Sequence, residues 1–237
     1  MSKPKSLVVL SGGQDSVTTL YAAARETEVV GAVHFRYGQK HAIERECAEF
    51  HIELMMLAEN RRIEFFEIDV PAFEQIGHSA LLKNGGDVCE SHPTLSHLPA
   101  SFVPGRNLIF LTLAAAQAMK IGATQIWTGV CQEDYSGYPD CRKGAVLTLE
   151  SAIRQGMDFP DLEIKTPLMY LTKAQTFALA EELGVLSDII QFTHTCYNGV
   201  REELHEWGYG CGECPACQVR KAGWEQFKRE KEGADAS

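Results

Sequence analysis

Near the start of the chain, a short apolar run at residues 7–10 is followed at once by the loop Ser-Gly-Gly-Gln-Asp-Ser at 11–16. A short apolar run that ends at glycines is typical of a buried strand leading into a tight turn. Residues 17–25 then have the pattern of a helix. A strand, a glycine loop and a helix in this order bring backbone N–H groups and the positive end of a helix together. The sequence therefore predicts an anion-binding site at this loop, which we call the glycine loop.

Strand-like and helix-like patterns alternate along much of the remaining chain. In 41–60 the apolar positions step by three and four residues, as in an amphipathic helix. Thr172 and Gly184 are suited to open and close another helix. Further helices are expected at 107–120, near 147–155 and at 173–183, and strands at 29–37, 63–70, 125–130 and near 164–167. This alternation predicts an α/β protein with an open, parallel, doubly wound sheet covered on both faces.

The charge balance and the apolar pattern exclude some classes of function. The chain has 22 Lys and Arg against 32 Asp and Glu, a formal net charge of −10, and neither half is basic. A protein that binds phosphate backbones without specificity carries the opposite excess. The apolar stretch at 108–119 is shorter than the ~20 residues that span a bilayer, and no signal-peptide pattern is present. We therefore expect a cytoplasmic protein with no nucleic-acid or membrane partner.

Four of the eight cysteines lie close together near the C-terminus. Cys196 is followed by Cys211-x-x-Cys214-x-x-Cys217, and Pro215 suits the first position of a final helix. In a reducing compartment such a set is a metal site rather than a pair of disulfides. A closed, structural Cys₄ zinc site is the leading hypothesis. An iron–sulfur cluster is the alternative, although a cysteine three residues further on is missing. His194 and His205 lie nearby and could replace a ligand.

The glycine loop lacks the Lys-Ser/Thr ending of the Walker loop and the spacing of the dinucleotide fingerprint. Asp15 is unfavourable beside bare phosphate, but it can hold a Mg²⁺ that bridges a pyrophosphate. Ser-Gly-Gly-x-Asp-Ser resembles the pyrophosphatase loop (PP-loop) of the N-type ATP pyrophosphatases. This resemblance implies an adenine nucleotide alpha hydrolase-like fold that binds ATP and Mg²⁺. The implied ATP-binding residues are Leu10, Ser11, Gly12, Gly13, Gln14, Asp15, Ser16, Val17, Thr18, Thr19 and Leu20.

Five further segments narrow the resemblance. They are Tyr-Gly-Gln-Lys-His at 37–41, Ser-Phe-Val-Pro-Gly-Arg-Asn at 101–107, Thr-Gly-Val-Cys at 128–131, the stretch 134–142, and Thr-Cys-Tyr-Asn-Gly at 195–199. In this order, over about residues 7–228, they resemble the 7-cyano-7-deazaguanine synthase family of queuosine biosynthesis. The connection between Cys196 and Cys211 is longer than the family pattern. The resemblance implies a nucleotide-binding domain at 1–192, a zinc-binding segment at 193–230 and a flexible tail at 231–237. The unpatterned stretch 71–106 is typical of a lid or binding loop.

The resemblance also implies a reaction. ATP adenylates 7-carboxy-7-deazaguanine, and ammonia displaces AMP to give an amide; a second ATP activates the amide oxygen, and loss of AMP leaves the nitrile. Asp15 would hold Mg²⁺, and Arg106 is the first candidate to neutralise the pyrophosphate, followed by Lys173 and Arg142; for each cation a surface ion pair is the alternative. The implied substrate-binding residues are Asp134, Tyr138, Asp140 and Arg142.

Several alternatives remain open at this point. Asp134 and Asp140 could accept hydrogen bonds from the guanidine-like edge of the base, or they could be simple turn residues. Cys131 and Cys141 have no activating partner in the sequence and are interpreted as packing or cavity-lining thiols. We expect a homodimer.

Two other functions are considered. A tRNA-modifying PP-loop ATP pyrophosphatase, of the thiolation or lysidine type, is the alternative function, and a zinc knuckle that binds nucleic acid or protein is a third. The acidic composition disfavours both.

Overall fold

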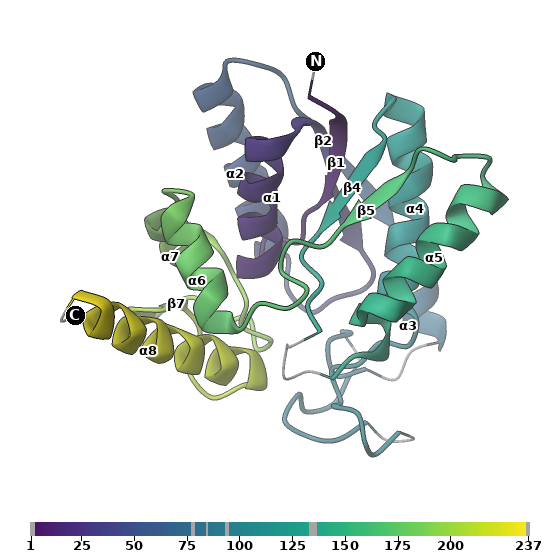
Figure 1. Cartoon of the computed structure of the whole chain (residues 1–237). Coiled ribbons are helices and arrows are strands. Elements are labelled where there is room, and N and C mark those ends of the chain that lie inside the picture. Colours follow the sequence, from purple (N-terminus) through teal and green to yellow (C-terminus); the bar gives the residue numbers. More distant parts are fainter. Residues whose placement is uncertain (1–2, 77–78, 84, 93–94, 133–136, 236–237) are drawn as a thin grey trace.

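The computed structural model describes residues 3–76, 79–83, 85–92, 95–132 and 137–235. One sheet of five parallel strands has the order β3-β2-β1-β4-β5 (Figure 1). The strands are β1 (Lys5–Val9), β2 (Glu28–Arg36), β3 (Glu64–Asp69), β4 (Gln125–Thr128) and β5 (Glu163–Lys165). The predicted open parallel sheet is thus confirmed. The chain moves outward on one side of β1 through β2 and β3, and then on its other side through β4 and β5.

Five helices lie where the sequence pattern placed them, and they are α1 (Gln14–Glu26), α2 (Ile43–Glu59), α4 (Arg106–Ile121), α5 (Lys143–Gly156) and α6 (Lys173–Glu182). Thr172 caps α6 by accepting a hydrogen bond from the backbone N–H of Gln175, and Gly184 follows the helix with a φ of +74°. Two short helices, α3 (Ala72–Ile76) and α7 (Leu186–Phe192), and the 3₁₀ turn η1 (Pro139–Cys141) were not expected.

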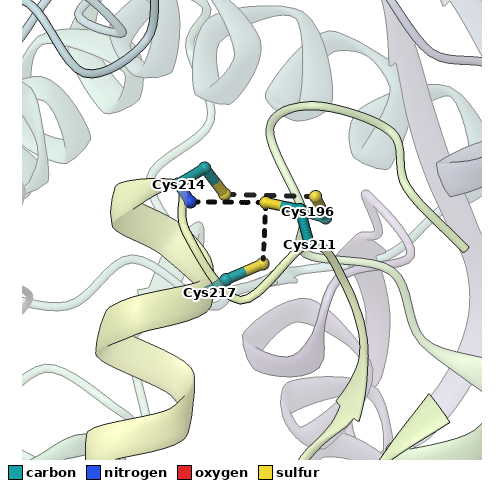
Figure 2. Close-up of side chains that lie close together, drawn as sticks. All are labelled: Cys196, Cys211, Cys214 and Cys217. Atoms are coloured by element: carbon teal, nitrogen blue, oxygen red, sulfur yellow. Dashed lines mark hydrogen bonds between the residues drawn. The ribbon is translucent and has the colours of Figure 1, made fainter. Parts of the chain in front are cut away.

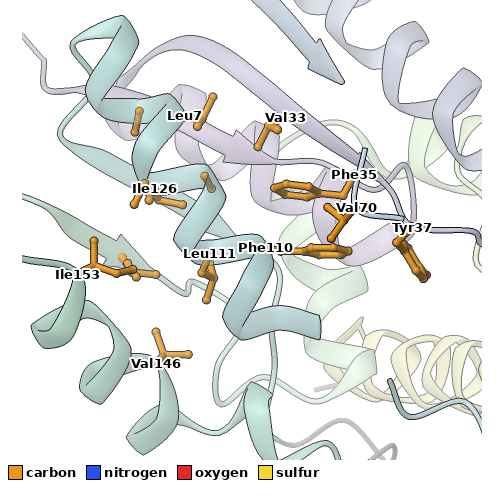
Figure 3. Packing of buried hydrophobic residues seen from close by; sticks show 14 of the residues in the cluster. Leu7, Val33, Phe35, Tyr37, Val70, Phe110, Leu111, Ile126, Val146 and Ile153 are labelled. Atoms are coloured by element: carbon orange, nitrogen blue, oxygen red, sulfur yellow. The ribbon is translucent and has the colours of Figure 1, made fainter. Parts of the chain in front are cut away.

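Side chains of each central strand alternate between two hydrophobic cores. Leu7 of β1 packs with Leu111 and Ile126 in the core beneath α4 and α5 (Figure 3). The next residue, Val8, points to the opposite face and packs with Val17 and Ile52 beneath α1 and α2. These side chains are completely or almost completely buried, and burying one such side chain contributes about 2 kcal/mol. The sheet is therefore covered on both faces, as predicted for a doubly wound fold.

The C-terminal segment packs beside α6. It contains a small antiparallel hairpin of β6 (Leu204–His205) and β7 (Gly208–Tyr209), followed by α8, which begins at Pro215 as predicted. Helix α8 lies beside α6 (Figure 1). Phe227 and Trp224 of α8 pack against Phe177 of α6. Helix α8 (Pro215–Asp235) includes residues 231–235 of the expected tail 231–237, and Lys231 pairs with Glu181 of α6.

None of the helices in the described residues is long and apolar enough to cross a membrane.

Candidate nucleotide site and metal centre

A cavity of about 260 Å³ lies at the carboxyl ends of the strands. It sits between β1 and β4, where the order of the strands reverses, which is the usual ligand position in open α/β sheets. Its walls come from the glycine loop, the ends of β2 and β4, the first turns of α2 and α4, and His194, Thr195 and Tyr197. Leu81, from the unpatterned stretch 71–106, also lines it.

The glycine loop is curved by hydrogen bonds to its own side chains. Ser16 Oγ accepts from the backbone N–H groups of Ser11 and Gly12, at 3.2 and 3.1 Å, and donates to the carbonyl of Gly13 at 3.0 Å. Gly12 has a φ of +93°, and a Cβ there would lie 1.9 Å from the carbonyl oxygen of Glu44. Only glycine fits between this loop and α2. The loop consequently directs the N-terminus of α1 toward the cavity.

Helix α1 begins at Gln14, three residues earlier than expected, so that the second half of the glycine loop is the first helical turn. Of the eleven predicted ATP-binding residues, those that line the cavity are Leu10, Ser11, Gly13, Gln14, Asp15 and Ser16. The side chains of the last four, Val17, Thr18, Thr19 and Leu20, are fully buried. The cavity wall is therefore the loop and the first turn of α1, and the next turn supports it from the core.

Asp15 and Lys173, both predicted to be catalytic, form an ion pair. Lys173 Nζ lies 2.7 Å from Oδ2 and 2.9 Å from Oδ1 of Asp15, and both side chains are mostly buried. The turn after β4 fits closely against the same place, because a Cβ at Gly129 would lie 2.8 Å from the backbone carbon of Asp15. The structure thus brings together residues that are 158 positions apart in the sequence.

Arg106, the third predicted catalytic residue, lies on the cavity wall at the start of α4. Its guanidinium carbon is 5.6 Å from the ring centre of Tyr37 and 5.7 Å from that of Tyr138, and Nη1 donates to Tyr37 Oη at 3.4 Å. These aromatic faces hold the cation in place. Tyr138, a predicted substrate-binding residue, also lines the cavity and shares a hydrogen bond of 2.7 Å with Ser101 Oγ.

Two other predicted substrate-binding residues, Asp140 and Arg142, do not line the cavity. Asp140 is buried, and its Oδ2 accepts a hydrogen bond of 2.9 Å from the backbone N–H of Asn107, at the N-terminus of α4. This contact favours the structural alternative for Asp140. Arg142 is exposed at the N-cap of α5, and neither residue lines the cavity. Asp134 lies outside the described residues. Cys131 and Cys141 do line the cavity.

Glu44 is a cavity residue that the sequence analysis missed. It lies in the first turn of α2 and lines the cavity opposite the positive charge of Arg106. Burial raises the pKa of this carboxyl group to about 7, although Arg106 acts in the opposite direction. The only hint in the sequence was its place just after the segment 37–41.

The four predicted metal-binding cysteines lie together at the start of α8 (Figure 2). All four Sγ atoms are within 4.8 Å of one another, and the pairs Cys196–Cys214 and Cys211–Cys217 are 4.0 Å apart. Tetrahedral sulfur ligands at about 2.3 Å from one ion are separated by about 3.8 Å. The cluster can therefore hold a single metal ion. Neither nearby histidine is directed to it, since His194 and His205 have ring nitrogens 3.1 and 3.0 Å from backbone carbonyls.

Arg220 of α8 joins this metal centre to the cavity, and it too was missed. The side chain is 1% exposed, and burial lowers its pKa to about 10. Nη1 donates to Thr195 Oγ1 and Nη2 to the carbonyl of Ile189, both at 2.9 Å. Thr195 precedes the ligand Cys196, lines the cavity and accepts from the backbone N–H of Gln14 at 3.5 Å. The metal centre and the glycine loop are thus parts of one structural unit.

The order of the strands and the glycine loop define an α/β protein with the PP-loop fold. The crystal structure of a 4-thiouridine synthetase–RNA complex with bound ATP shares this fold, with a TM-score of 0.52 and 15% identity, over 95% of this chain and 53% of that one.

Similarity to known protein sequences identifies the family within this fold class. A family model described as queuosine biosynthesis protein QueC matches residues 5–228. A 7-cyano-7-deazaguanine synthase of Wolinella succinogenes is 46% identical over 229 residues, covering 96% of this chain and 95% of that protein. One from Helicobacter pylori (strain Shi470) is 48% identical over 225 residues, covering 94% and 96%. The chain belongs to the QueC family of queuosine biosynthesis proteins.

Proposed function

We propose that this chain is a 7-cyano-7-deazaguanine synthase that converts 7-carboxy-7-deazaguanine, ammonia and ATP to the nitrile. The full-length relationship to synthases points to this reaction. The observation that carries it in the chain itself is the Asp15–Lys173 pair at the glycine loop, in which Asp15 lines the cavity at the strand ends. A loop that binds phosphate next to a fixed carboxylate and a fixed cation is suited to displace pyrophosphate from ATP.

The reaction has two rounds of activation. A carboxylate oxygen of the acid attacks the α-phosphorus of ATP, pyrophosphate leaves, and ammonia then forms the C–N bond as AMP departs. In the second round the amide oxygen attacks another ATP, and the C–O bond breaks to leave the nitrile and AMP. Lys173 lies where it can counter negative charge at the glycine loop, and Arg106 supplies a second positive charge on the cavity wall.

Magnesium bound with ATP would neutralise charge on the leaving pyrophosphate, and Asp15 is the residue that would hold it. Its carboxylate is part of the cavity wall at the loop, and oxygen ligands are those that Mg²⁺ prefers. The contact with Lys173 orients this carboxylate before the ligand arrives.

Zinc is the ion proposed for the four cysteines. The spacing of their sulfur atoms suits one tetrahedral ion, whereas the thiolates around a four-iron cluster lie further apart because each binds a different iron. A closed Cys₄ set leaves no open position for a substrate, so the role of this ion is structural.

The proposal includes a cytoplasmic location and a homodimer. The location is supported by the free thiols of a cysteine-rich chain, and the lack of a nucleic-acid partner by the net charge of −10. The subunit number can be measured by sedimentation equilibrium.

The reaction is tested with purified protein, Mg-ATP, ammonium and 7-carboxy-7-deazaguanine. We expect a product with the mass of the nitrile, and release of AMP that depends on the acid. No AMP with this substrate, combined with ATP turnover on bulk tRNA, would favour a tRNA-modifying ATP pyrophosphatase instead.

A further inference from the structure

We propose that Glu44 is the general base that removes protons from nitrogen during the reaction of ammonia and of the amide. This inference rests on the proposed function and assigns a residue to the part of the reaction that follows adenylation. The chemistry requires such a group, because ammonia carries three hydrogens and the nitrogen of a nitrile carries none.

The position of Glu44 places it on the cavity wall beside the glycine loop. Its backbone carbonyl is packed against Gly12, so the first turn of α2 lies directly beside the glycine loop. Among the described residues that line the cavity, only Asp15 and Glu44 carry carboxylates. Asp15 is bound by Lys173, whereas no hydrogen bond or ion pair to the Glu44 carboxylate is found in the described part of the chain. Glu44 is thus the carboxylate left to accept a proton.

The groups around Glu44 set the pKa of its carboxyl group in a range that suits a general base. The charged and titratable groups that face it are Arg106 from α4, Tyr37 after β2 and Cys47 on its own helix. Burial favours its neutral form, and the positive charge of Arg106 favours its ionised form. The resulting pKa of about 7 is suited to a base that accepts and releases protons at neutral pH.

The three histidines that line the cavity are less suited than Glu44 to act as the general base. A ring nitrogen of His34, His41 and His194 contacts the backbone carbonyl of Leu10, Tyr197 and Cys196, respectively. Burial lowers the pKa of His34, which makes it a weak base. The other nitrogen of His41, Nδ1, is covered by Gly199, where an added Cβ would lie 2.2 Å from it.

The proton balance follows the two rounds. When ammonia attacks the acyl adenylate, a C–N bond forms, the C–O bond to AMP breaks, and nitrogen loses one proton. When the amide oxygen attacks ATP, an O–P bond forms, pyrophosphate leaves, and nitrogen loses the second proton. When the C–O bond then breaks, AMP leaves with the oxygen, the C≡N bond is completed and the third proton is lost. Glu44 takes each proton and passes it to water, and no oxidant or reductant is needed.

The test is a rapid-quench comparison of wild type with Glu44→Gln and, as a matched control, Glu46→Gln. Glu46 is exposed in the same helical turn and does not line the cavity. With the acid and ammonium, Glu44→Gln should release the first pyrophosphate within about threefold of the wild-type rate, because forming the acyl adenylate removes no proton from nitrogen. Formation of amide and AMP should fall by about 10²–10⁴-fold, as expected for loss of a general base. Glu46→Gln should match wild type in both.

A second readout separates this role from a structural one. With free ammonia held constant across pH, amide formation by wild type should rise through a pKa of about 7, and Glu44→Gln should lack this rise. Loss of pyrophosphate release in proportion to amide formation would overturn the inference, since Glu44 would then act in substrate binding or folding. Amide formation at the wild-type rate would overturn it as well. Wild type that releases no pyrophosphate with the acid would instead overturn the proposed function, and this inference with it.

Discussion

Lys173 Nζ and Asp15 Oδ2 are 2.7 Å apart, which joins the N-terminus of α6 to the N-terminus of α1. A lysine in the first turn of a helix is opposed by the helix dipole. The contact with Asp15 offsets this cost and holds both side chains at the glycine loop. The pair therefore has the geometry of a preorganised binding group rather than that of a surface ion pair.

Substitution of Asp15 should separate chemistry from folding. In Asp15→Asn the loop keeps its backbone contacts, but Lys173 loses the carboxylate of Asp15 and the proposed Mg²⁺ site loses its ligand. We expect acid-dependent pyrophosphate release to fall at least about 100-fold, with a loss of about 2 kcal/mol in the free energy of unfolding. Glu182→Gln is the control, because it breaks the exposed pair with Arg25 between the same two helices. If Asp15→Asn released pyrophosphate as fast as this control, Asp15 would have no role in the chemical step.

Loss of a metal ligand should affect the nucleotide site as well as the C-terminal segment. Cys214→Ser is expected to lower the bound zinc measured by elemental analysis, the melting temperature, and ATP binding measured by calorimetry. The reason is that Thr195 and Tyr197, the two neighbours of Cys196 in the sequence, line the cavity. Cys89→Ser, which changes an exposed cysteine outside the set, should keep one zinc per chain. Full ATP affinity in metal-free Cys214→Ser would show that the two sites are independent.

Arg220 should act as a positioning residue for the glycine loop. Arg220→Met removes the 2.9 Å hydrogen bond to Thr195 Oγ1 and leaves only the longer contact from the backbone N–H of Gln14 among those described. We expect unfolding to become easier by about 3 kcal/mol and the KM for ATP to rise, with a smaller change in kcat. Lys221→Met, at the exposed next position, is the control. An unchanged KM for ATP in a destabilised Arg220→Met would restrict Arg220 to a structural role.

Because His51 is buried, we expect the free energy of unfolding to depend on pH. Burial lowers its pKa to about 4, below the value of about 6.5 in an unfolded chain. Between these values the unfolded state binds more protons, so stability is complete above pH 6.5 and is lost as the pH falls toward 4. The loss at pH 5 is about 2 kcal/mol for this group. Denaturant titrations of His51→Gln should show a correspondingly smaller decrease from pH 7 to 5. The exposed His97→Gln should follow wild type, and a decrease as large in His51→Gln as in wild type would exclude His51 as the cause.

Local signals predicted most of the elements. The cap at Thr172, Gly184 and Pro215 set helix ends correctly because each acts within a few residues. The end of β4 at Thr128 was missed, since residues 129–131 continue the apolar pattern but leave the sheet to line the cavity. The short helix α7 was missed because its seven residues carry little periodicity.

The candidate site was predictable where it lies in a contiguous motif. The glycine loop and the cysteine spacing are recognisable as motifs in the sequence. The roles of Glu44 and Arg220, in contrast, depend on contacts between distant segments. For Asp140 the sequence left a substrate-binding role and a turn role open, and its hydrogen bond from the backbone N–H of Asn107 at the start of α4 favours the structural role. Sequence patterns report which residues are polar, and only the packing decides which of them face the cavity.

The most direct test of the account is the ratio of AMP to nitrile in one reaction mixture. Purified protein with Mg-ATP, ammonium and 7-carboxy-7-deazaguanine should yield two AMP for each nitrile, measured by chromatography and mass spectrometry, with the amide as a transient intermediate. A reaction that stops at the amide with one AMP, or that releases no AMP with this acid, would contradict the account.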